Sequence, residues 1–554
     1  MQSLVAVSCS KVYSRALSVH TKDRQNLFSF TKGRWLYNNE KQITSRHVPF
    51  NVSALVDAAV EAAGAHSCMS FEKLDEGLFN RVFVLRLDND EELIARIPFH
   101  LAGPKHFTTA SEVATMDYAL TELQLPVPRV RAWSSHAERT LVGTEYIIYD
   151  KVPGVELQKR WWDPDVKGTL AMDLITTIVA FERVFIDKRF SQIGSLYFKE
   201  DLPLSLQTSS LYAVEAPTPN SERFRIGPSL NREFWRGERA ALNVDRGPWS
   251  DAHLYARALS ACERAWLTHS DTHPSEEHLF LLDDFDKLVP FLIPSVPAFI
   301  LWHPDMHEAN IIATESDPCK ITGIIDWQST VIGPYFMQVS PFPLLEYTPS
   351  PYIDYTPWDR KPPKRTPGYD MLNAEQKQKA DLAYKAAFRS HAYELKMREL
   401  NPTMMDIVQQ ATAREIALRP LRAITRGRTE GLAAIRDTLI DVCDYWGHLV
   451  GLDADGVPTV PCPVRYTDAE RARHKVEYEG LLKACRLRET LYQQLGLEAD
   501  GFVTSERYDA VKDMSDKEMQ KSLDVAQTEE ERVWIQQHWP IQDGQLSYSA
   551  ETCQ

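Results

Sequence analysis

Alternating apolar positions mark a group of short strands in the first third of the chain. From Phe71 to Pro98 the apolar residues form three runs, and the polar triplet 88–90 separates the last two runs as a hairpin turn. A further pair of apolar runs lies at 130–133 and 145–149. The pattern therefore predicts a small sheet of five antiparallel strands.

Two helices accompany these strands. Residues 51–66 are rich in small and apolar side chains, and from Thr109 onward apolar residues recur at helical spacing until Pro126 ends the pattern. We expect one helix to precede the sheet and the other to cross it.

The chain changes character after Gly154, where long helical patterns alternate with loops. Residues 203–249 form a long irregular insertion, and helices dominate again from Asn373, one of them opened by a capping box at 467–470. Three short strands are predicted between the helices, at 298–302, 311–313 and 321–325. These patterns predict an α+β fold with a strand-rich part followed by a large, mainly helical part.

Length and composition indicate a large globular protein. The 554 residues are 44% hydrophobic and 25% charged, which suffices for two or three packing units and excludes global disorder. No uncharged apolar stretch approaches the ~18 residues that a membrane-spanning helix needs. The net charge of −15 argues against nucleic-acid binding, and eight cysteines without a CxxC pair indicate neither a disulfide framework nor a zinc site.

The charge is unevenly distributed along the chain. Residues 1–48 hold eight Lys and Arg against two acids, a net charge of +6, and the remaining residues carry −21. The first 22 residues contain no acid and are rich in serine, a composition typical of a mitochondrial transit peptide. The alternative is a disordered basic tail without a targeting role. As a transit peptide, the segment would be recognised by the mitochondrial import machinery and removed just before residue 51.

The candidate chemistry lies in two motifs beside the predicted strands of the helical part. Asp305 and Asn310 belong to the segment His-Pro-Asp-Met-His-Glu-Ala-Asn, and Asp326 follows a strand pair in Ile-Ile-Asp-Trp. Phosphoryl transfer needs a loop carboxylate to orient and deprotonate a hydroxyl, and an amide oxygen and a second carboxylate to hold Mg²⁺. The three side chains, in this order and spacing, supply those oxygens. The alternative is a turn Asp, a capping Asn and a strand-end Asp.

These motifs resemble the catalytic loop and metal-binding motif of the aminoglycoside phosphotransferase and choline kinase-like superfamily. The resemblance covers about Phe71 to Pro334. The segment from Thr109 to Met116, the Gly-Pro motifs at 227–228 and 247–248, and the basic leader resemble a narrower fungal group, the "altered inheritance of mitochondria" proteins. The resemblance implies a fungal source, a bilobal protein-kinase-like fold, and transfer from ATP to a hydroxyl with Mg²⁺.

The same resemblance implies roles for the residues of the two motifs. Asp305 would be the catalytic base, and Asn310 and Asp326 would be the metal ligands. His303 would either brace the loop by hydrogen bonding or take part in the chemistry. His307 would be either a second brace or a substrate contact.

The residues that bind the nucleotide are expected in the strand-rich part. Gly77 and Asn80 resemble the phosphate-covering hairpin of the family, although a hairpin with one glycine is also an ordinary turn. Arg96 stands where the family carries a strand lysine; its planar fork could bridge two phosphates, or it could be a surface arginine. Either reading of Arg96 leaves the affinity for ATP open.

Three further residues are assigned to the same region. Glu112 would pair with Arg96, but Thr109 and Glu112 also match a capping box, which would explain Glu112 locally. Tyr149 and Val152 lie where the chain would cross between lobes, beside the adenine, or they are ordinary core residues.

The acceptor is a small molecule or protein of unknown identity, and Trp235, Arg246 and Trp249 would either line its site or pack the insertion.

The domain organisation follows from these assignments. The expected segments are the leader at 1–48, a kinase-like N-lobe at 51–150, a C-lobe at 151–350 that includes the 203–249 insertion, and a helical C-terminal extension at 351–540.

Three functions are compatible with the sequence. The first is a phosphotransferase that uses ATP and Mg²⁺ with Asp305 as its base. The second is a pseudokinase or binding protein of mitochondria, which Arg96 and the single-glycine hairpin favour. The third is transfer of AMP rather than phosphate.

Overall fold

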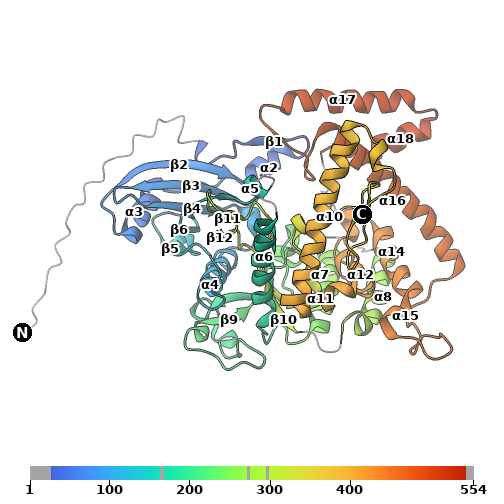
Figure 1. Cartoon of the computed structure of the whole chain (residues 1–554), viewed down its shortest axis with the longest axis horizontal. Helices are drawn as coiled ribbons and strands as arrows, with labels where there is room; N and C mark the ends of the chain where they lie inside the picture. The colour runs from blue at the N-terminus through green and yellow to red at the C-terminus, as the bar shows by residue number, and fades with distance from the viewer. Residues whose placement is uncertain (1–25, 162–167, 271–274, 295–297, 544–554) are drawn as a thin grey trace, which may run out of the picture. The chain divides into compact units, whose positions relative to one another are not determined.

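The computed structural model describes residues 26–161, 168–270, 275–294 and 298–543, so the first 25 residues of the expected leader lie outside the described residues. The chain forms two compact units. The sheet unit comprises described residues 26–32, 43–102 and 130–151, and the helical unit comprises 33–42, 103–129 and the described residues from 152 onward. Figure 1 labels the helices and strands of both.

The sheet unit contains the five strands predicted from the sequence. The sheet is antiparallel throughout, and its strand order is β2-β3-β4-β6-β5. Its strands are β2 (Cys68–Glu76), β3 (Asn80–Leu87), β4 (Glu92–Pro98), β5 (Val130–Ser134) and β6 (Tyr146–Asp150). The side chains of Phe83, Leu85 and Leu93 are fully buried. Phe83 and Leu85 are two positions apart on β3, and Leu85 pairs with Leu93 of β4, so the three side chains lie on one face of the sheet.

One helix of the sheet unit was also predicted. α3 (Val52–Ala63) begins where the Asn51 side chain accepts a hydrogen bond from the amide of Ala54. It ends at Gly64, whose φ of 63° lets the chain turn in the left-handed region at no steric cost. Its residues Leu55 and Ala59 have no solvent exposure.

The helical unit holds the longest helices of the chain. α6 and α10 pack side by side, as do α7 and α8 and also α12 and α14 (Figure 1). The helices are α4 (Phe107–Thr121), α5 (Gln158–Trp161), α6 (Thr169–Asp187), α7 (Ala252–Ser270), α8 (Glu276–Leu292), α9 (Tyr335–Gln338), α10 (Ala374–Leu400), α11 (Pro402–Gln409), α12 (Ala411–Ala423), α13 (Gly427–Glu430), α14 (Leu432–Asp444), α15 (Trp446–Val450), α16 (Asp468–Leu495), α17 (Tyr508–Val525) and α18 (Glu529–His538). The predicted capping box at Thr467 and Glu470 opens α16. Within the described ranges, no helix combines the length and apolar character that crossing a bilayer requires.

Small sheets lie among these helices. β10 (Phe299–Trp302) pairs with β13 (Val331–Pro334), and β7 (Val155–Glu156), β11 (Ile311–Ala313) and β12 (Ile321–Ile324) form a three-stranded sheet. The 203–249 segment is less irregular than expected, because β9 (Phe224–Gly227) pairs with β8 (Ser195–Phe198). A short β14 (Ile353–Asp354) and β15 (Lys364–Arg365) precede α10. The architecture is therefore the α+β, protein-kinase-like fold that the resemblance implies.

Part of the segment assigned to the leader is folded. β1 (Gly33–Trp35) pairs with β16 (Phe502–Thr504), and α2 (Asn39–Ser45) follows it. Trp35 has no solvent exposure, and its indole Nε1 donates to Asp500 Oδ2 at 2.9 Å. The packed part of the chain therefore starts well before residue 51, because a buried tryptophan and a strand pair precede that position.

Candidate active site

The two candidate motifs occupy adjoining loops of the helical unit. β10 leads into the loop 303–310, which we call the first loop, and the loop 325–330, the second loop, leads into β13. Because Trp302 at the end of β10 pairs with Val331 at the start of β13, both loops lie at the same end of this strand pair. The antiparallel register therefore brings together residues that are twenty positions apart in the sequence.

His303 joins the two loops through both nitrogens of its ring. Its Nδ1 accepts a hydrogen bond from the Asp305 amide at 3.1 Å, so its Nε2 carries the hydrogen and donates to the Ile325 carbonyl at 3.0 Å. The imidazole also packs edge-on against Trp327 with ring centroids 4.6 Å apart. Burial lowers the pKa of His303 to about 4, so the ring is neutral at physiological pH. These contacts favour the bracing role of His303, and a part in the chemistry stays a prediction.

Asp305 forms a close pair with His307 in the first loop. Their Oδ2 and Nε2 atoms are 3.4 Å apart, and the Asp305 side chain is 63% exposed. The hydrogen bond from His307 lowers the pKa of Asp305, and the same bond raises the pKa of His307. His307 Nδ1 accepts from the Ala309 amide at 3.1 Å. These contacts favour the bracing role of His307, and a substrate contact stays a prediction.

Asn310 is held by its amide nitrogen. Its Nδ2 donates to the Asp305 carbonyl at 2.9 Å, and its backbone carbonyl accepts from the Ile325 amide at 2.9 Å. The first bond leaves the side-chain oxygen as the atom that could face an ion. The second ties Asn310 to the residue that directly precedes Asp326.

Asp326 has an unusual backbone conformation at the start of the second loop. Its φ is 65°, in the left-handed region that few residues with a side chain adopt. The next residue, Trp327, is fully buried and its Nε1 donates to the Ile324 carbonyl at 2.9 Å. The buried indole fixes the turn, and such conformations are concentrated at functional sites because the surrounding structure must hold them.

The side-chain oxygen atoms of Asn310 and Asp326 are hard ligands, which suit Mg²⁺. Throughout the described ranges, no three His, Cys, Asp or Glu side chains gather as a metal site. Magnesium sites with substrate phosphates use only one or two protein carboxylates, together with phosphate oxygens and water. The donor set of Asn310 and Asp326 therefore fits Mg²⁺ in this role.

One charged residue near these loops was not singled out in the sequence. Arg232 lies in a 3₁₀ turn, Arg232–Phe234, of the 203–249 insertion. Burial lowers the pKa of its guanidinium, while the negative charges of Asp326 and Asp305 raise it, so Arg232 lies in the electrostatic field of both carboxylates. No sequence signal distinguishes it from the other arginines of the insertion.

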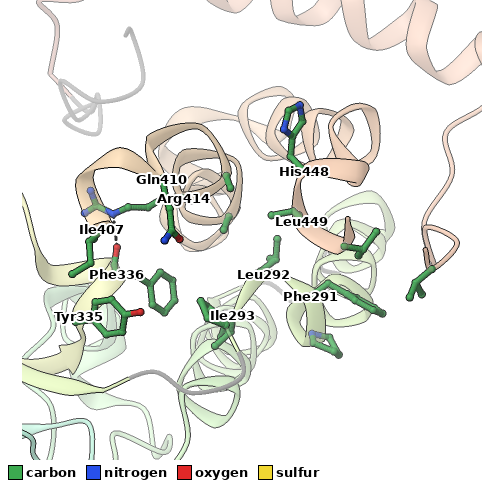
Figure 2. Close-up of a pocket in the computed structure, with 16 residues that line it drawn as sticks. Phe291, Leu292, Ile293, Tyr335, Phe336, Ile407, Gln410, Arg414, His448 and Leu449 are labelled. Atoms are coloured by element: carbon green, nitrogen blue, oxygen red, sulfur yellow. Dashed lines mark hydrogen bonds between the residues drawn. The ribbon is translucent and has the colours of Figure 1, made fainter. Parts of the chain in front are cut away.

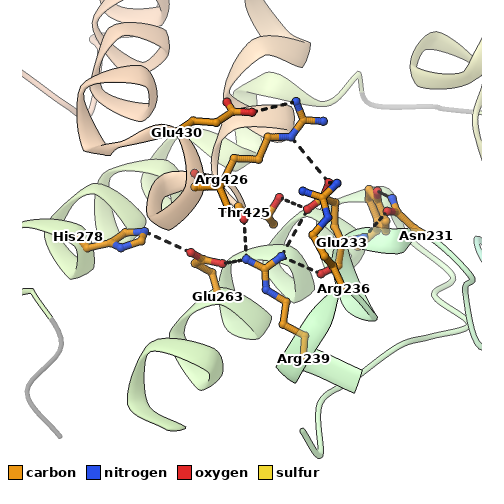
Figure 3. A network of polar contacts seen from close by, with 11 residues as sticks. Asn231, Glu233, Arg236, Arg239, Glu263, His278, Thr425, Arg426 and Glu430 are labelled. Carbon is orange, nitrogen blue, oxygen red and sulfur yellow. Dashed lines mark hydrogen bonds and ion pairs between the residues drawn. The ribbon is translucent and has the colours of Figure 1, made fainter. Parts of the chain in front are cut away.

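The insertion that carries Arg232 is anchored by a buried ion network (Figure 3). Arg239 pairs with Glu263 and donates to the Thr425 carbonyl, and Thr425 in turn donates to Glu233 at 2.8 Å. Arg239 is 3% exposed and Glu263 is fully buried. Because Glu233 is adjacent to Arg232, the network fixes the position of this turn against α7 and the chain after α12.

Val152 has a packing role in the helical unit. A Cβ atom added to Gly323 of β12 would lie 2.7 Å from Val152 Cγ1, so glycine is needed here for close approach. The Thr322 hydroxyl donates to the Pro153 carbonyl at 2.7 Å, which holds the same contact. Val152 thus supports the hairpin between the two loops; contact with adenine stays a prediction.

The sheet unit carries the other expected nucleotide contacts. Gly77 lies in the loop between β2 and β3, where its amide donates to the Asn80 carbonyl at 3.0 Å. Its φ is outside the left-handed region, and a Cβ there would meet only that carbonyl at 3.9 Å, so the fold does not require glycine. Arg96 on β4 is 6% exposed, which excludes the surface reading, and Tyr149 on β6 is partly buried.

The local explanation for Glu112 is wrong. α4 begins at Phe107 rather than at Thr109, after His106 with a φ of 67° and without a side-chain cap. Thr109 is therefore the third residue of the helix and cannot be its cap. Glu112 lies in the helix interior and is 2% exposed. Its pairing with Arg96 stays a prediction.

The three residues considered for the acceptor have packing contacts. Arg246 stacks on Trp235 at 3.9 Å from the ring centroid and donates to the Arg239 carbonyl at 2.7 Å. Trp249 is 3% exposed, and its Nε1 donates to Asp245 at 2.8 Å. These contacts favour the packing alternative, and an acceptor role stays a prediction.

Sequence comparison decides the family of the chain. A family model described as "Phosphotransferase enzyme family" matches residues 70–339. A subtelomeric hrmA-associated cluster protein of Aspergillus fumigatus is 30% identical over 540 residues, which cover 86% of this chain and 97% of that protein. The chain belongs to the phosphotransferase enzyme family. Its membership supports a phosphotransferase-type activity.

Further fungal relatives match along most of the chain. Altered inheritance of mitochondria protein 9 of Candida dubliniensis, named as mitochondrial, is 23% identical over 537 residues, covering 85% of this chain and 84% of that protein. Proteins of the same name from other yeasts are 22–25% identical, which confirms the expected fungal group. Among solved structures, one titled a putative aminoglycoside phosphotransferase, from Ralstonia eutropha, matches with a TM-score of 0.35 and 14% identity, covering 72% of this chain and 98% of that one.

Proposed function

We propose that this protein is a phosphotransferase that moves a phosphoryl group from ATP to a hydroxyl group of its acceptor. The observation that carries the proposal is the bonded pair of loops, in which Asp305, Asn310 and Asp326 are held through His303 and Ile325. An isolated turn Asp and a capping Asn would not need a buried, neutral histidine that links one loop to the other.

Asp305 acts as the base in this proposal. Its carboxylate is exposed enough to meet an incoming hydroxyl, and the His307 bond, which lowers its pKa, keeps it ionised. An ionised carboxylate can orient the hydroxyl and accept its proton as the new bond to phosphorus forms. Arg232, in the field of Asp305 and Asp326, would attract the negatively charged phosphate groups toward this end of the strand pair.

Asn310 and Asp326 would hold Mg²⁺. When bound, the ion neutralises charge on the nucleotide phosphates. The hydrogen bond from Asn310 to the Asp305 carbonyl fixes the direction of the amide, so that its oxygen is already oriented for an ion. The strained turn at Asp326 would do the same for the second oxygen ligand.

The sheet unit would bind the nucleotide. Arg96 would contact two phosphates with its planar guanidinium, and Glu112 would orient it. The hairpin with Gly77 and Asn80 would lie over the phosphates, with Tyr149 and Val152 beside the adenine. The amide of Gly77 already donates to Asn80, so the hairpin would have to open this bond before that amide could bind a phosphate.

The test uses the purified full chain. Binding of ATP is measured by calorimetry with and without Mg²⁺, and turnover is followed by release of ADP with candidate hydroxyl acceptors. Absence of binding at millimolar ATP would refute the proposal. Intact mass separates the kinds of transfer, since phosphate adds about 80 Da and AMP about 329 Da to a modified protein.

The pseudokinase alternative gives a different result in the same experiment. ATP would bind, but no acceptor would give turnover, and Asp305→Asn would leave every signal unchanged. The buried environment of Arg96 is the feature that favours this alternative, because a buried arginine can be retained for structure alone.

We further propose that the protein acts in mitochondria. The basic composition of residues 1–48 and the word mitochondrial in the names of the yeast relatives support this location. The import machinery would then be a partner through the leader.

A further inference from the structure

Two cysteine side chains lie in contact in the C-terminal half of the helical unit. The Sγ atoms of Cys443 and Cys462 are 3.7 Å apart. Cys443 is near the end of α14, and Cys462 is in the loop 451–467 that leads to α16. Both are free thiols of intermediate exposure, and neither has a part in the phosphoryl transfer proposed above.

The loop that carries Cys462 is fixed along its length. The Trp446 indole donates to the Val460 carbonyl at 2.7 Å, and the Thr459 amide donates to the Gly451 carbonyl at 3.1 Å. The thiol of Cys443 lies 3.6 Å from the Val464 carbonyl, so the chain on the far side of Cys462 is held as well. Prolines at 461 and 463 restrict the backbone on both sides of the cysteine. The short distance between the sulfurs is therefore set by an anchored loop.

We propose that Cys443 and Cys462 form a redox site, in which a peroxide converts the two thiols into a reversible disulfide. The sulfurs must move closer by about 1.7 Å to reach the bonded distance of about 2.05 Å, a change within the range of side-chain rotation. The two residues are nineteen positions apart in the sequence, so the bond would close one loop within the unit.

The order of reaction follows from the surroundings of the two thiols. Cys462 stands between the exposed Pro461 and Pro463, so peroxide reaches its sulfur first. The thiol of Cys443 lies against the Val464 carbonyl, and burial raises its pKa, so it is the poorer first nucleophile. The sulfur of Cys462 attacks the peroxide as its thiol gives up a proton; the O–O bond breaks, a sulfenic acid forms on that sulfur, and the leaving hydroxide takes up the proton as water. The sulfur of Cys443 then attacks that sulfur; the S–O bond breaks, and the oxygen leaves as water with the Cys443 proton. In total two thiols lose two electrons and one hydrogen peroxide is reduced to two waters.

The disulfide would restrain one wall of a cavity of about 480 Å³ (Figure 2). Val460, two residues before Cys462, lines this cavity together with Leu449 and Val450, which follow α14. Phe291, Leu292 and Phe336 line other parts of it. Oxidation would add a covalent bond between the end of α14 and the loop that contributes Val460, in addition to the hydrogen bonds that already anchor this wall.

The experiment exposes the full chain to hydrogen peroxide and follows one peptide. Trypsin cleaves after Arg436 and Arg465, and the peptide 437–465 contains Cys443, Cys462 and no other cysteine. After peroxide we expect this peptide to lose about 2 Da, to resist alkylation at both cysteines, and to regain both alkylation sites after reduction. Cleavage at the aspartates between the two cysteines should leave two fragments that separate only after reduction.

Serine variants test the order of reaction. In Cys443→Ser, a dimedone probe should trap the sulfenic acid on Cys462. In Cys462→Ser, Cys443 should stay unmodified at the same peroxide concentration. The matched control is Cys485→Ser, which removes a single buried cysteine and should leave the disulfide unchanged. Full alkylation of peptide 437–465 after peroxide, or a disulfide from either residue to another peptide, would overturn the proposal.

Discussion

The Nε2 of His303 donates to the carbonyl of Ile325 at 3.0 Å, across 22 positions of sequence. With its other nitrogen the ring accepts the Asp305 amide, so one buried side chain sets the spacing between the candidate base and the residue before Asp326. The residue types of the two motifs were recognised in the sequence, but their spatial arrangement depends on this single neutral ring.

The first prediction concerns the stability of the protein at acid pH. His303 has a pKa of about 4 in the folded chain and about 6.5 when unfolded. Below pH 6.5 the unfolded chain therefore binds a proton that the folded chain does not, and stability is lost as the pH falls toward 4. Lowering the pH from 7 to 4.5 should cost roughly 2–3 kcal/mol through this group.

Urea unfolding of the wild type and of His303→Gln at both pH values measures this contribution. The loss between pH 7 and 4.5 should be smaller in the variant by that amount. His278, whose pKa burial also lowers to about 4, is present in both proteins, so the difference isolates His303. His448→Gln, at an exposed histidine, is the control and should keep the wild-type pH dependence. Equal losses in His303→Gln and the wild type would contradict the buried neutral state.

The second prediction separates binding from turnover. Asp305→Asn should lower turnover by about 10²–10⁴-fold, because the amide cannot accept the proton, and should leave ATP binding within a factor of a few. Glu315→Gln changes an exposed acid in the adjacent hairpin and should have wild-type rates. Turnover of Asp305→Asn within threefold of the wild type would exclude Asp305 as the base.

The same variant gives a signal that does not depend on the acceptor. The Asp305 carboxylate raises the pKa of His307, so Asp305→Asn should lower that pKa toward 6.5. Titration of the His307 ring by NMR measures the shift. An unchanged titration would show that the two side chains are not paired in solution.

The third prediction concerns the packing under the two loops. Gly323→Ala should destabilise the protein by about 1–3 kcal/mol, since its Cβ would lie 2.7 Å from Val152 Cγ1. Val152→Ala should restore part of that loss in the double variant. Gly480→Ala, inside α16 with nothing within 4 Å of the new Cβ, should instead stabilise by about 0.5–1 kcal/mol. A loss in Gly323→Ala that Val152→Ala does not reduce would exclude this contact as its cause.

The fourth prediction concerns the ion network that anchors the insertion. Arg239→Met leaves the fully buried Glu263 without its main cation and should cost about 3–5 kcal/mol, measured by urea unfolding. The double variant with Glu263→Met should recover most of this. Arg236→Met removes a half-exposed ion pair with Glu233 at 3.8 Å and should change stability by less than about 1 kcal/mol. Equal effects at positions 236 and 239 would contradict the dependence on burial.

The fifth prediction revises the position of the leader cut. Trp35 is fully buried and β1 pairs with β16, so we expect the mature chain to begin before Gly33 rather than just before residue 51. A chain lacking residues 1–50 should be less soluble and melt at lower temperature than one lacking residues 1–28. N-terminal sequencing of protein from mitochondria, and a fluorescent fusion of residues 1–32, test the cut and the targeting. A mature terminus beyond Trp35, or a cytosolic fusion, would contradict this expectation.

The five strands of the sheet unit, the strands β10, β11 and β12, and the helices α3 and α16 were predictable because their signals are local. The alternation in 71–98 and the capping box at Thr467 each act within a few positions, and the structure confirms them. The start of α4 was missed because His106 begins it without a side-chain hydrogen bond. For the candidate site, residue types were recognised, whereas the position of Arg232 depends on a network that joins residues nearly two hundred positions apart.

The pairing of β1 with β16 also determines how late in synthesis this part of the chain can fold. Gly33 is synthesised 471 residues before its partner Thr504. At about 5–20 residues per second, this interval lasts roughly 25–90 s. Throughout it, the indole of Trp35 lacks both the strand and the Asp500 carboxylate that bury and bond it. The segment next to the basic leader therefore completes its packing only near the end of synthesis, although it is among the first to be synthesised.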